Sequence, residues 1–312
     1  MKKLMKILLP VVVVLVLAVA CFGGSDEVKS PSGVTGDTPK AQITIAETVL
    51  YDAGGVKVTA TGLEDNYLGK QVKLLVENET GRSLIVTSED LSVNGYMMPL
   101  SSFYTEVAAG KKANDTITLL SSELKQSGID TVAQIQFRIA VKDGENWTSV
   151  ANSDLLTLST SAAPYEQPVD DSGDTLYNAG GIRVVCKGLK QDVIWDGTVV
   201  FFMENTCGKD IYVYAENVSV NGFMQTASLW SSLRSGTKII DGMSMLNLSD
   251  LQIDSIDQIK NIEFNLRIVD ADTFHEIATT DVLFSVVLGI GLACFGNWLA
   301  HRIPDRRLLL NQ

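Results

Sequence analysis

The chain of 312 residues has only two histidines, His275 and His301, and this scarcity argues against the commonest catalytic arrangements. A Ser-His-Asp or Cys-His site needs a histidine beside its nucleophile. The segment that carries His275 has an equivalent earlier in the chain, where Thr148 takes the matching position, so the repeat does not require the histidine. No P-loop or metallohydrolase motif is present. The sequence therefore predicts a protein that is not an enzyme and needs no cofactor.

Basic charge is also scarce. The chain has 25 lysines and arginines against 37 acidic residues, a formal net charge of −12. Binding to nucleic acid needs a basic face, so a nucleic-acid partner is excluded. The 46% of hydrophobic residues and 20% of charged residues are typical of a globular protein.

The N-terminus has the pattern of a signal peptide over residues 1–20. Lys2, Lys3 and Lys6 precede the apolar run "ILLPVVVVLVLAVA", which is too short for a typical spanning helix. Cys21 follows directly in "LAVAC", which resembles the lipobox of bacterial lipoproteins, although Ala18 stands where that family prefers leucine. The resemblance implies cleavage before Cys21 and attachment of fatty acids such as palmitate to its thiol. The alternative is an ordinary secretory signal.

Residues 21–40 follow as a tether rich in Gly, Ser, Pro and charge, which predicts a flexible spacer. The lipidated cysteine and this spacer would hold the folded part at the outer face of the cell membrane.

The chain repeats itself. "SVNGYM" at 92–97 returns as "SVNGFM" at 219–224, and we call this the SVNG phrase. "YDAGGVKVTATGL" at 51–63 likewise returns as "YNAGGIRVVCKGL" at 177–189. The offset stays at 126 or 127 residues over about a hundred positions, which indicates a duplicated domain. We predict repeat 1 over 41–160, a surface linker over 161–174 and repeat 2 over 175–285.

Each copy has the pattern of β-strands. In "VKVTAT", apolar residues alternate with polar ones, as expected for a strand with one buried face. The Asn-Gly pair of the SVNG phrase favours a tight turn with positive φ at both residues. One helix signal stands at 121–128. The fold class is therefore all-β, with two tandem immunoglobulin-like antiparallel sandwiches.

The combination of lipobox, polar tether and tandem sandwiches resembles secreted lipoproteins of Gram-positive bacteria that carry repeated immunoglobulin-like domains. The resemblance covers residues 1 to 285. Its motifs are structural, so it implies location and fold and no activity.

Two further cysteines, Cys186 and Cys207, lie in repeat 2. A disulfide between them is chemically permitted outside the cell. If the strands around 190–197 form a hairpin, however, the two thiols lie out of register by several residues. Pairing and two free cysteines both remain open.

Acidic loops and exposed aromatic residues are the remaining candidates for ligand contact. The loops at 142–146, 169–174 and 269–273 lack the ligand spacing of a calcium loop, so no metal site is predicted. The aromatic residues are at equivalent places in both copies, where a core role competes with recognition. They are Tyr96, Phe223, Trp147 and Phe274.

The C-terminal segment, 286–312, departs from the repeat. Residues 282–300 carry no charge and are followed by arginines, as in a transmembrane helix with positive residues inside. Residues 282–285, however, align with the last strand of repeat 1. A genuine span and an aberrant tail of foreign coding origin are both compatible with the sequence.

These observations predict a non-catalytic, membrane-anchored surface lipoprotein that acts as an envelope or extracellular binding module. Its partners would be membrane lipid through Cys21 and a protein or cell-wall polymer. The alternative is an adhesion or solute-capture protein that clamps a ligand between its two domains. A secreted enzyme is the least favoured alternative.

Overall fold

The structure is a computed structural model that describes residues 42–190, 197–245, 251–285 and 293–294. The predicted signal peptide, Cys21 and the tether lie outside the described residues. The described residues from Ile43 onward belong to one compact unit, which contains both copies of the repeat.

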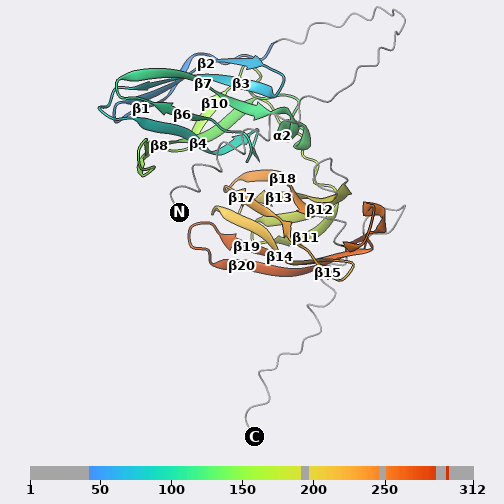
Figure 1. The fold of residues 1–312 in the computed structure, drawn as a ribbon. Coiled ribbons are helices and arrows are strands. Elements are labelled where there is room, and N and C mark those ends of the chain that lie inside the picture. The colour runs from blue at the N-terminus through green and yellow to red at the C-terminus, as the bar shows by residue number, and fades with distance from the viewer. Residues whose placement is uncertain (1–41, 191–196, 246–250, 286–292, 295–312) are drawn as a thin grey trace, which may run out of the picture. The chain divides into compact units, whose positions relative to one another are not determined.

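The first copy is a sandwich of two antiparallel layers (Figure 1). One layer has the strand order β1-β2-β3-β7, and the other contains β10, β8, β4 and β5, with β6 and β9 paired alongside. The strands are β1 (Thr48–Ala53), β2 (Val56–Asp65), β3 (Gly69–Asn78), β4 (Leu84–Val93), β5 (Tyr96–Met97), β6 (Tyr104–Val107), β7 (Lys111–Leu120), β8 (Gln134–Asp143), β9 (Ser149–Asn152) and β10 (Leu156–Ser159). The helix signal corresponds to α2 (Ser121–Gln126).

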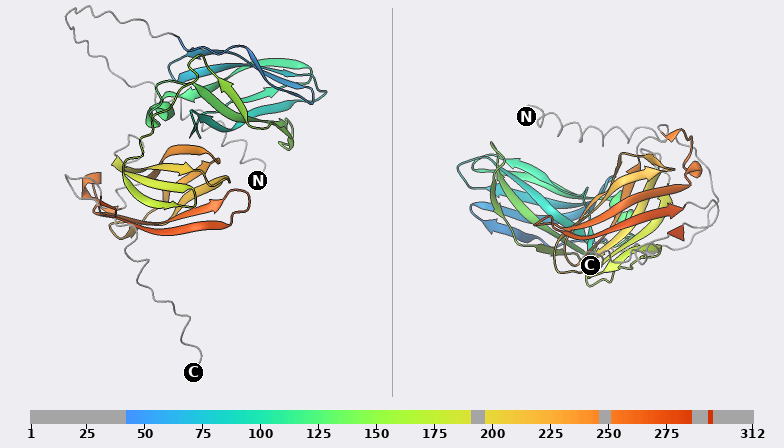
Figure 2. Two further views of the ribbon diagram at one scale, coloured as in Figure 1. Left: turned by 180° about the vertical axis from the view of Figure 1, so that it is seen from behind. Right: turned by 90° about the horizontal axis from the view of Figure 1, so that it is seen from below.

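The second copy repeats this plan, as the view from behind also shows (Figure 2). Strands β11, β12, β13 and β18 form one layer, and β15, β14, β19 and β20 form the other. Their bounds are β11 (Asp174–Ala179), β12 (Ile182–Lys190), β13 (Gly197–Asn205), β14 (Ile211–Val220), β15 (Phe223–Met224), β16 (Ala227–Ser228), β17 (Trp230–Leu233), β18 (Thr237–Met245), β19 (Asn261–Asp270) and β20 (Glu276–Ser285), with the short 3-10 helix η3 (Ile256–Gln258). The prediction of an all-β chain with two sandwiches is confirmed.

The alternation seen in the sequence determines which side of each strand is buried. In β2, Val56, Val58 and Ala60 are almost completely buried. Irregularities of register recur at equivalent places: β2 shifts between Ala60 and Gly62, and β12 shifts between Cys186 and Gly188. Such bulges bend a strand in a defined way, so their recurrence shows that the two copies have the same backbone plan.

The SVNG phrase forms the same turn in both copies. Asn94 and Gly95 have φ values of 49° and 82°, and Asn221 and Gly222 have 54° and 81°. The predicted positive φ at both residues is therefore confirmed. Each asparagine side chain also bonds to a distant loop: the Asn94 Oδ1 atom accepts hydrogen bonds from the backbone N–H groups at 133 and 134, both 3.0 Å long.

The two copies are joined through this phrase. β5 of the first copy pairs in parallel with β18 of the second, which connects strands of both copies into one 11-stranded sheet. The Lys238 N–H donates to the Gly95 carbonyl oxygen at 2.8 Å. The Arg234 Nη2 atom donates to the Ser92 hydroxyl at 2.9 Å. We call this contact the internal joint.

The linker is also held by hydrogen bonds. Gln167 accepts a hydrogen bond from the Asn94 amide at 3.0 Å and donates to the Gly128 carbonyl at 2.9 Å. Asp170 and Asp171 form ion pairs with Lys187 and Arg183 of the second copy. The sequence predicts a surface linker here, and these bonds tie it to both copies.

The end of β20 reaches Ser285, so residues 282–285 belong to the last long strand of the second sandwich, as the alignment with the first copy requires. Beyond it only Ala293–Cys294, β21, is described, and it pairs with β20. Within the described residues, no helix has the length and hydrophobicity that crossing a membrane requires. The rest of 286–312 lies outside the described residues.

Candidate functional site: an exposed aromatic run

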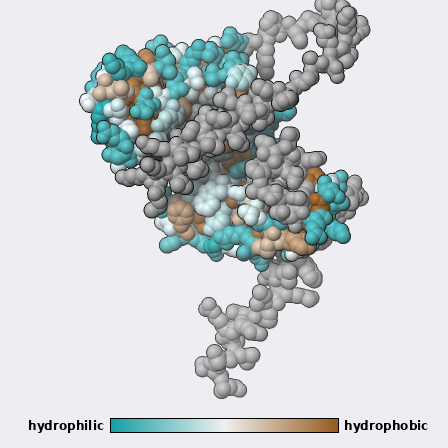
Figure 3. Space-filling view, in the orientation of Figure 1, coloured by the Kyte–Doolittle hydropathy of each residue, from teal (hydrophilic) through white to brown (hydrophobic). Residues whose placement is uncertain are grey.

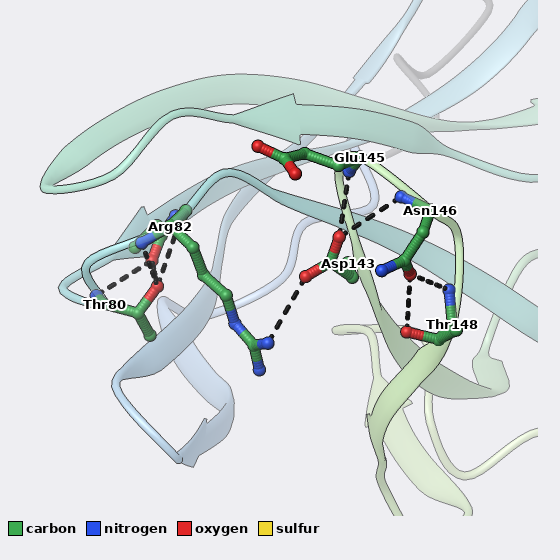
Figure 4. Close-up of polar contacts among 7 residues, drawn as sticks. Thr80, Arg82, Asp143, Glu145, Asn146 and Thr148 are labelled. Atoms are coloured by element: carbon green, nitrogen blue, oxygen red, sulfur yellow. Dashed lines mark hydrogen bonds and ion pairs between the residues drawn. The ribbon is translucent and has the colours of Figure 1, made fainter.

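A tight turn between β8 and β9 of the first copy is held by polar contacts of Asp143 with Arg82, Glu145 and Asn146 (Figure 4). The Asp143 Oδ1 atom accepts hydrogen bonds from the backbone N–H groups of Glu145 and Asn146, at 3.0 and 3.2 Å. The other carboxylate oxygen pairs with Arg82 at 3.3 Å. Asp and Asn favour such turns because their side chains can bond to the backbone two or three residues ahead. The turn brings Trp147 to a positive φ of 66°.

The second copy builds the same turn between β19 and β20. Asp270 accepts from the N–H groups of Asp272 and Thr273, and its second oxygen pairs with Lys209 at 2.9 Å. These bonds, first the one from Lys209, hold the pKa of Asp270 well below its ordinary value. Phe274 takes the position of Trp147, with a φ of 56°.

Each of these residues stacks on a ring from the sheet. In the first copy, the ring centres of Trp147 and Tyr104 are 5.7 Å apart with an interplanar angle of 24°. In the second copy, Phe274 stacks on Tyr212 at 5.5 Å and 28°. Offset stacking at such distances is favourable for aromatic pairs. The turn residue stacks on a ring in both copies, but the partner differs: Tyr104 has the place of Trp230 in the second copy, and Tyr212 has the place of Ile85 in the first.

In the second copy the rings form a continuous series along β14 and β17. Trp230 lies 5.3 Å from Tyr212 and stacks on Tyr214 at 5.0 Å and 21°. The guanidinium of Arg267 lies 5.6 Å from the centre of the Tyr214 ring. We call the set Phe274, Tyr212, Trp230, Tyr214 and Arg267 the aromatic run. The first copy has Ile85 and Thr87 where the run has its two tyrosines, so the first copy has only one stacked pair.

The aromatic run has two exposed rings, on Trp230 and Phe274, and is flanked by charge. Trp230 and Phe274 expose 55% and 61% of their surface. The Arg267 guanidinium pairs with Glu216 at 3.2 Å and with Glu276 at 2.8 Å, and these hydrogen bonds raise its pKa. Exposed aromatic side chains beside an arginine are typical of the centre of a protein interface.

The four aromatic residues predicted to contact a ligand differ in how far they are exposed to solvent. Trp147 and Phe274 are exposed at 45% and 61%, and Phe223 is exposed at 54%. Tyr96 is only 2% exposed, and burial raises its pKa to about 12. Tyr96 therefore offers no surface to a ligand, because it fills the internal joint.

Sequence reasoning missed Trp230, Tyr212, Tyr214 and Tyr104. The alternation of Tyr212 and Tyr214 with apolar neighbours in "IYVYAEN" was a usable signal, since it places both rings on the polar face of one strand. Their contact with Trp230 depends on strand pairing between β14 and β17, which the sequence does not specify.

A hollow of about 270 Å³ lies beside the aromatic run, and Trp230 lines it together with Met97, Leu100, Glu123 and Asp241. Burial raises the pKa of both carboxyl groups. Glu123 accepts hydrogen bonds from the Leu100 N–H and the Ser101 hydroxyl.

Asp241 is held in a similar way, since it accepts from the Ser231 hydroxyl at 2.6 Å and the Gly242 N–H at 2.7 Å. All four carboxyl oxygens of the two acidic residues thus accept hydrogen bonds from the chain itself. This pair consequently gives no support to the enzyme alternative, and the classification as a non-enzyme stays a prediction.

The acidic loops and the cysteines give no ligand site among the described residues. Asp143, Asp170 and Asp270 each pair with a lysine or arginine of the chain itself. No group of three or more metal-ligating side chains occurs in this part of the chain. Cys186 is buried and Cys207 is half-buried, and both are free.

Comparisons with known proteins add no function. No protein-family model and no curated protein matches the chain. Among solved structures, the YadV chaperone is similar at 10% identity over 68% of this chain and 91% of that chain, with a TM-score of 0.22. Red sea bream transglutaminase is similar at 9% identity over 73% of this chain and 29% of that chain, with a TM-score of 0.17. At such TM-scores neither likeness supports a conclusion.

Proposed function

We propose that the protein is a lipid-anchored, non-catalytic binding module of the cell surface, and that the aromatic run of the second copy is its contact surface for a protein partner. The observation that carries the proposal is the series of exposed rings ending at Arg267. Aromatic residues and arginine are the residue types that most often dominate binding energy at protein interfaces.

The stacked arrangement supports this function because the rings are already fixed. Phe274 is held by the Asp270 turn, and Tyr212 and Trp230 by adjacent strands. A surface that is ordered before binding loses less conformational entropy when the partner arrives. The paired carboxylates on both sides of Arg267 add polar groups at the rim.

The test compares capture of surface proteins by the full chain and by two variants. Trp230→Ala removes the central ring, and we expect at least a tenfold loss of affinity for a captured protein, about 1.4 kcal/mol or more. Tyr67→Ala removes an aromatic ring that is 78% exposed and far from the run in sequence, and it serves as the matched control. Equal capture by both variants would contradict a role for the aromatic run. Capture of a cell-wall polymer instead of a protein would refute the partner class.

The anchor is tested separately. Cys21→Ser removes the only thiol in the lipobox-like sequence, so fatty-acid labelling should disappear and the protein should be released from the membrane. Labelling that persists in this variant would rule out the lipoprotein assignment and leave the binding test unaffected.

A second candidate function, capture of a small solute, is favoured by the hollow beside Trp230. Both copies line it, which fits the idea of a ligand held between two domains. Leu100→Trp would fill the hollow from a residue that is 70% exposed, and it should abolish solute binding while leaving protein capture intact.

A further inference from the structure

The SVNG phrase is covered in one copy and uncovered in the other. Tyr96 and Met97 are 2% and 6% exposed, whereas the equivalent Phe223 and Met224 are 54% and 67% exposed. The backbone of the phrase is the same in both copies, so the difference comes from what lies against it. Two adjacent large apolar side chains at the open edge of a sheet are an unusual feature of a solvent-facing surface.

The internal joint shows what covers the first phrase. The Gly95 carbonyl accepts from the Lys238 N–H at the edge of β18, and Tyr96 packs in one cluster with Val185 and Phe202 of the second copy. The Ile240 side chain packs against the same cluster. The edge of β18 and the outer face of its sheet therefore form a receiving surface for an SVNG phrase.

The first copy has its own version of this receiving surface. β7 occupies the place of β18, because Lys111 pairs with Asn78 as Thr237 pairs with Asn205. Lys112 thus corresponds to Lys238. Among the described strands, β7 pairs on one side only, with β3. Its other edge presents unpaired backbone groups, which can add a further strand.

We propose that the chain associates head to tail with a second copy of itself: the exposed SVNG phrase of repeat 2 in one molecule docks on the β7 edge of repeat 1 in the next. The contact would copy the internal joint, with the Lys112 N–H donating to the Gly222 carbonyl of the other molecule. It uses two different surfaces, so a pair of molecules leaves one of each surface free and can add further molecules, up to an open chain or a closed ring according to the rotation between neighbours. This inference goes beyond the proposed binding function and does not depend on it.

The two copies differ in sequence at two equivalent positions, and these differences would supply opposite charges at the proposed contact between molecules. In the internal joint, Arg234 of the second copy reaches Gln136 of the first, at 3.3 Å. Between molecules, the exposed Glu263 takes the place of Gln136, and Lys111 stands at the receiving edge where the internal joint has Thr237. A lysine and a glutamate so placed favour the contact.

The outer face of the receiving sheet is less apolar in the first copy. Leu75 and Asn114 stand where the second copy has Phe202 and Ile240, and Thr59, which corresponds to Val185, is already buried at 5% exposure. On the side of the molecule that Figure 3 shows, most of the surface of the first copy that is not grey is hydrophilic, with a few hydrophobic patches. Less apolar area is buried by docking there, so the contact between molecules is weaker than the internal joint and forms at high local concentration.

The experiment is sedimentation velocity of the full chain over a wide range of concentration, in one detergent solution. We expect the average mass to rise with concentration. The double variant Phe223→Asp/Met224→Asp, which alters only exposed side chains, should stay monomeric over the same range. Tyr67→Asp, which changes an equally exposed ring elsewhere, should associate like the wild type. A mass that stays constant for the wild type, or that rises equally for the double variant, overturns the proposal.

Mixing two defective variants tests the head-to-tail geometry. Lys112→Pro removes the N–H group of the receiving edge, and an edge strand tolerates proline there. It should be monomeric alone, yet a mixture with the double variant should form dimers and nothing larger, since each retains one intact surface. Dimers of Lys112→Pro alone would indicate a twofold phrase-to-phrase contact and overturn the proposal.

If Lys112→Pro loses its β circular dichroism, Lys111→Glu replaces it: this variant should weaken association, and adding Glu263→Lys should restore it.

Discussion

Single residues of the SVNG phrase have the same backbone in both copies but different surroundings. Gly95 and Gly222 have φ values of 82° and 81°, and a Cβ atom added at either would meet no atom within 4 Å. A valine at either position would destabilise the fold through backbone strain alone, because no neighbouring atom obstructs its side chain. The two positions therefore form a matched pair in which strain can be measured without steric overlap.

We expect Gly95→Val and Gly222→Val to lower the free energy of unfolding by about 1–3 kcal/mol each, and by equal amounts. The serines should differ. Ser219→Ala should change the free energy of unfolding by less than about 0.5 kcal/mol, as at an ordinary position. Ser92→Ala removes the shorter of two hydrogen bonds of the buried Arg234 guanidinium, the other being to Gln136, and should cost about 1–3 kcal/mol. Urea unfolding of the four full-length variants measures this, and equal effects at both serines would contradict the internal joint.

At the scale of elements, the turn that holds Phe274 links the aromatic run to pH. The folded-state pKa of Asp270 is lowered, so the charged form is favoured by folding. This stabilisation is complete above the unfolded pKa, about 3.9, and is lost as the pH falls through the lower folded value.

Asp270→Asn should therefore be less stable than the wild type at pH 7, and this difference should shrink as the pH falls below about 4. Urea midpoints across this range provide the measurement. Tyr212 and Phe274 should lose their ring stacking in the variant, which near-ultraviolet circular dichroism reports. A difference in stability that is constant with pH would mean that the carboxylate charge plays no part.

Elements differ in how far the sequence predicts them. The strands and the Asn-Gly turns follow from local patterns, since alternation and positive φ depend on neighbouring residues only. The aromatic run does not, because Trp230 meets Tyr212 and Tyr214 across a strand pair that only the folded sheet brings together. The burial of Tyr96 could not be predicted from the sequence either. The same phrase is exposed in repeat 2, and Tyr96 is buried only because residues of the second copy pack against it.

At the scale of the whole molecule, the internal joint makes the two copies unequal. Tyr96 and its equivalent Phe223 give a direct comparison. Tyr96→Ala should cost about 3–5 kcal/mol, as for a large buried ring, and it leaves a cavity between the copies. Phe223→Ala should stay within about 0.5 kcal/mol at low concentration. Equal costs in urea unfolding of the full chain would place Tyr96 at the surface and refute the joint.

The joint also predicts how the copies behave when they are separated. Fragment 41–160 retains a complete pair of sheets and fragment 175–285 lacks only Asp174 of β11, so each should show β-rich circular dichroism and a cooperative melt. Separation exposes Tyr96 on one fragment, and Val185 and Phe202 on the other. Each fragment should therefore melt below the temperature of the full chain, and mixing the two should raise both melting temperatures, because the joint can reform between them.

Calorimetry of the fragments, their mixture and the full chain provides the test. Identical melting temperatures in all four samples would show that the two sandwiches are energetically independent, and failure of both fragments to fold would show that the joint is part of one indivisible core.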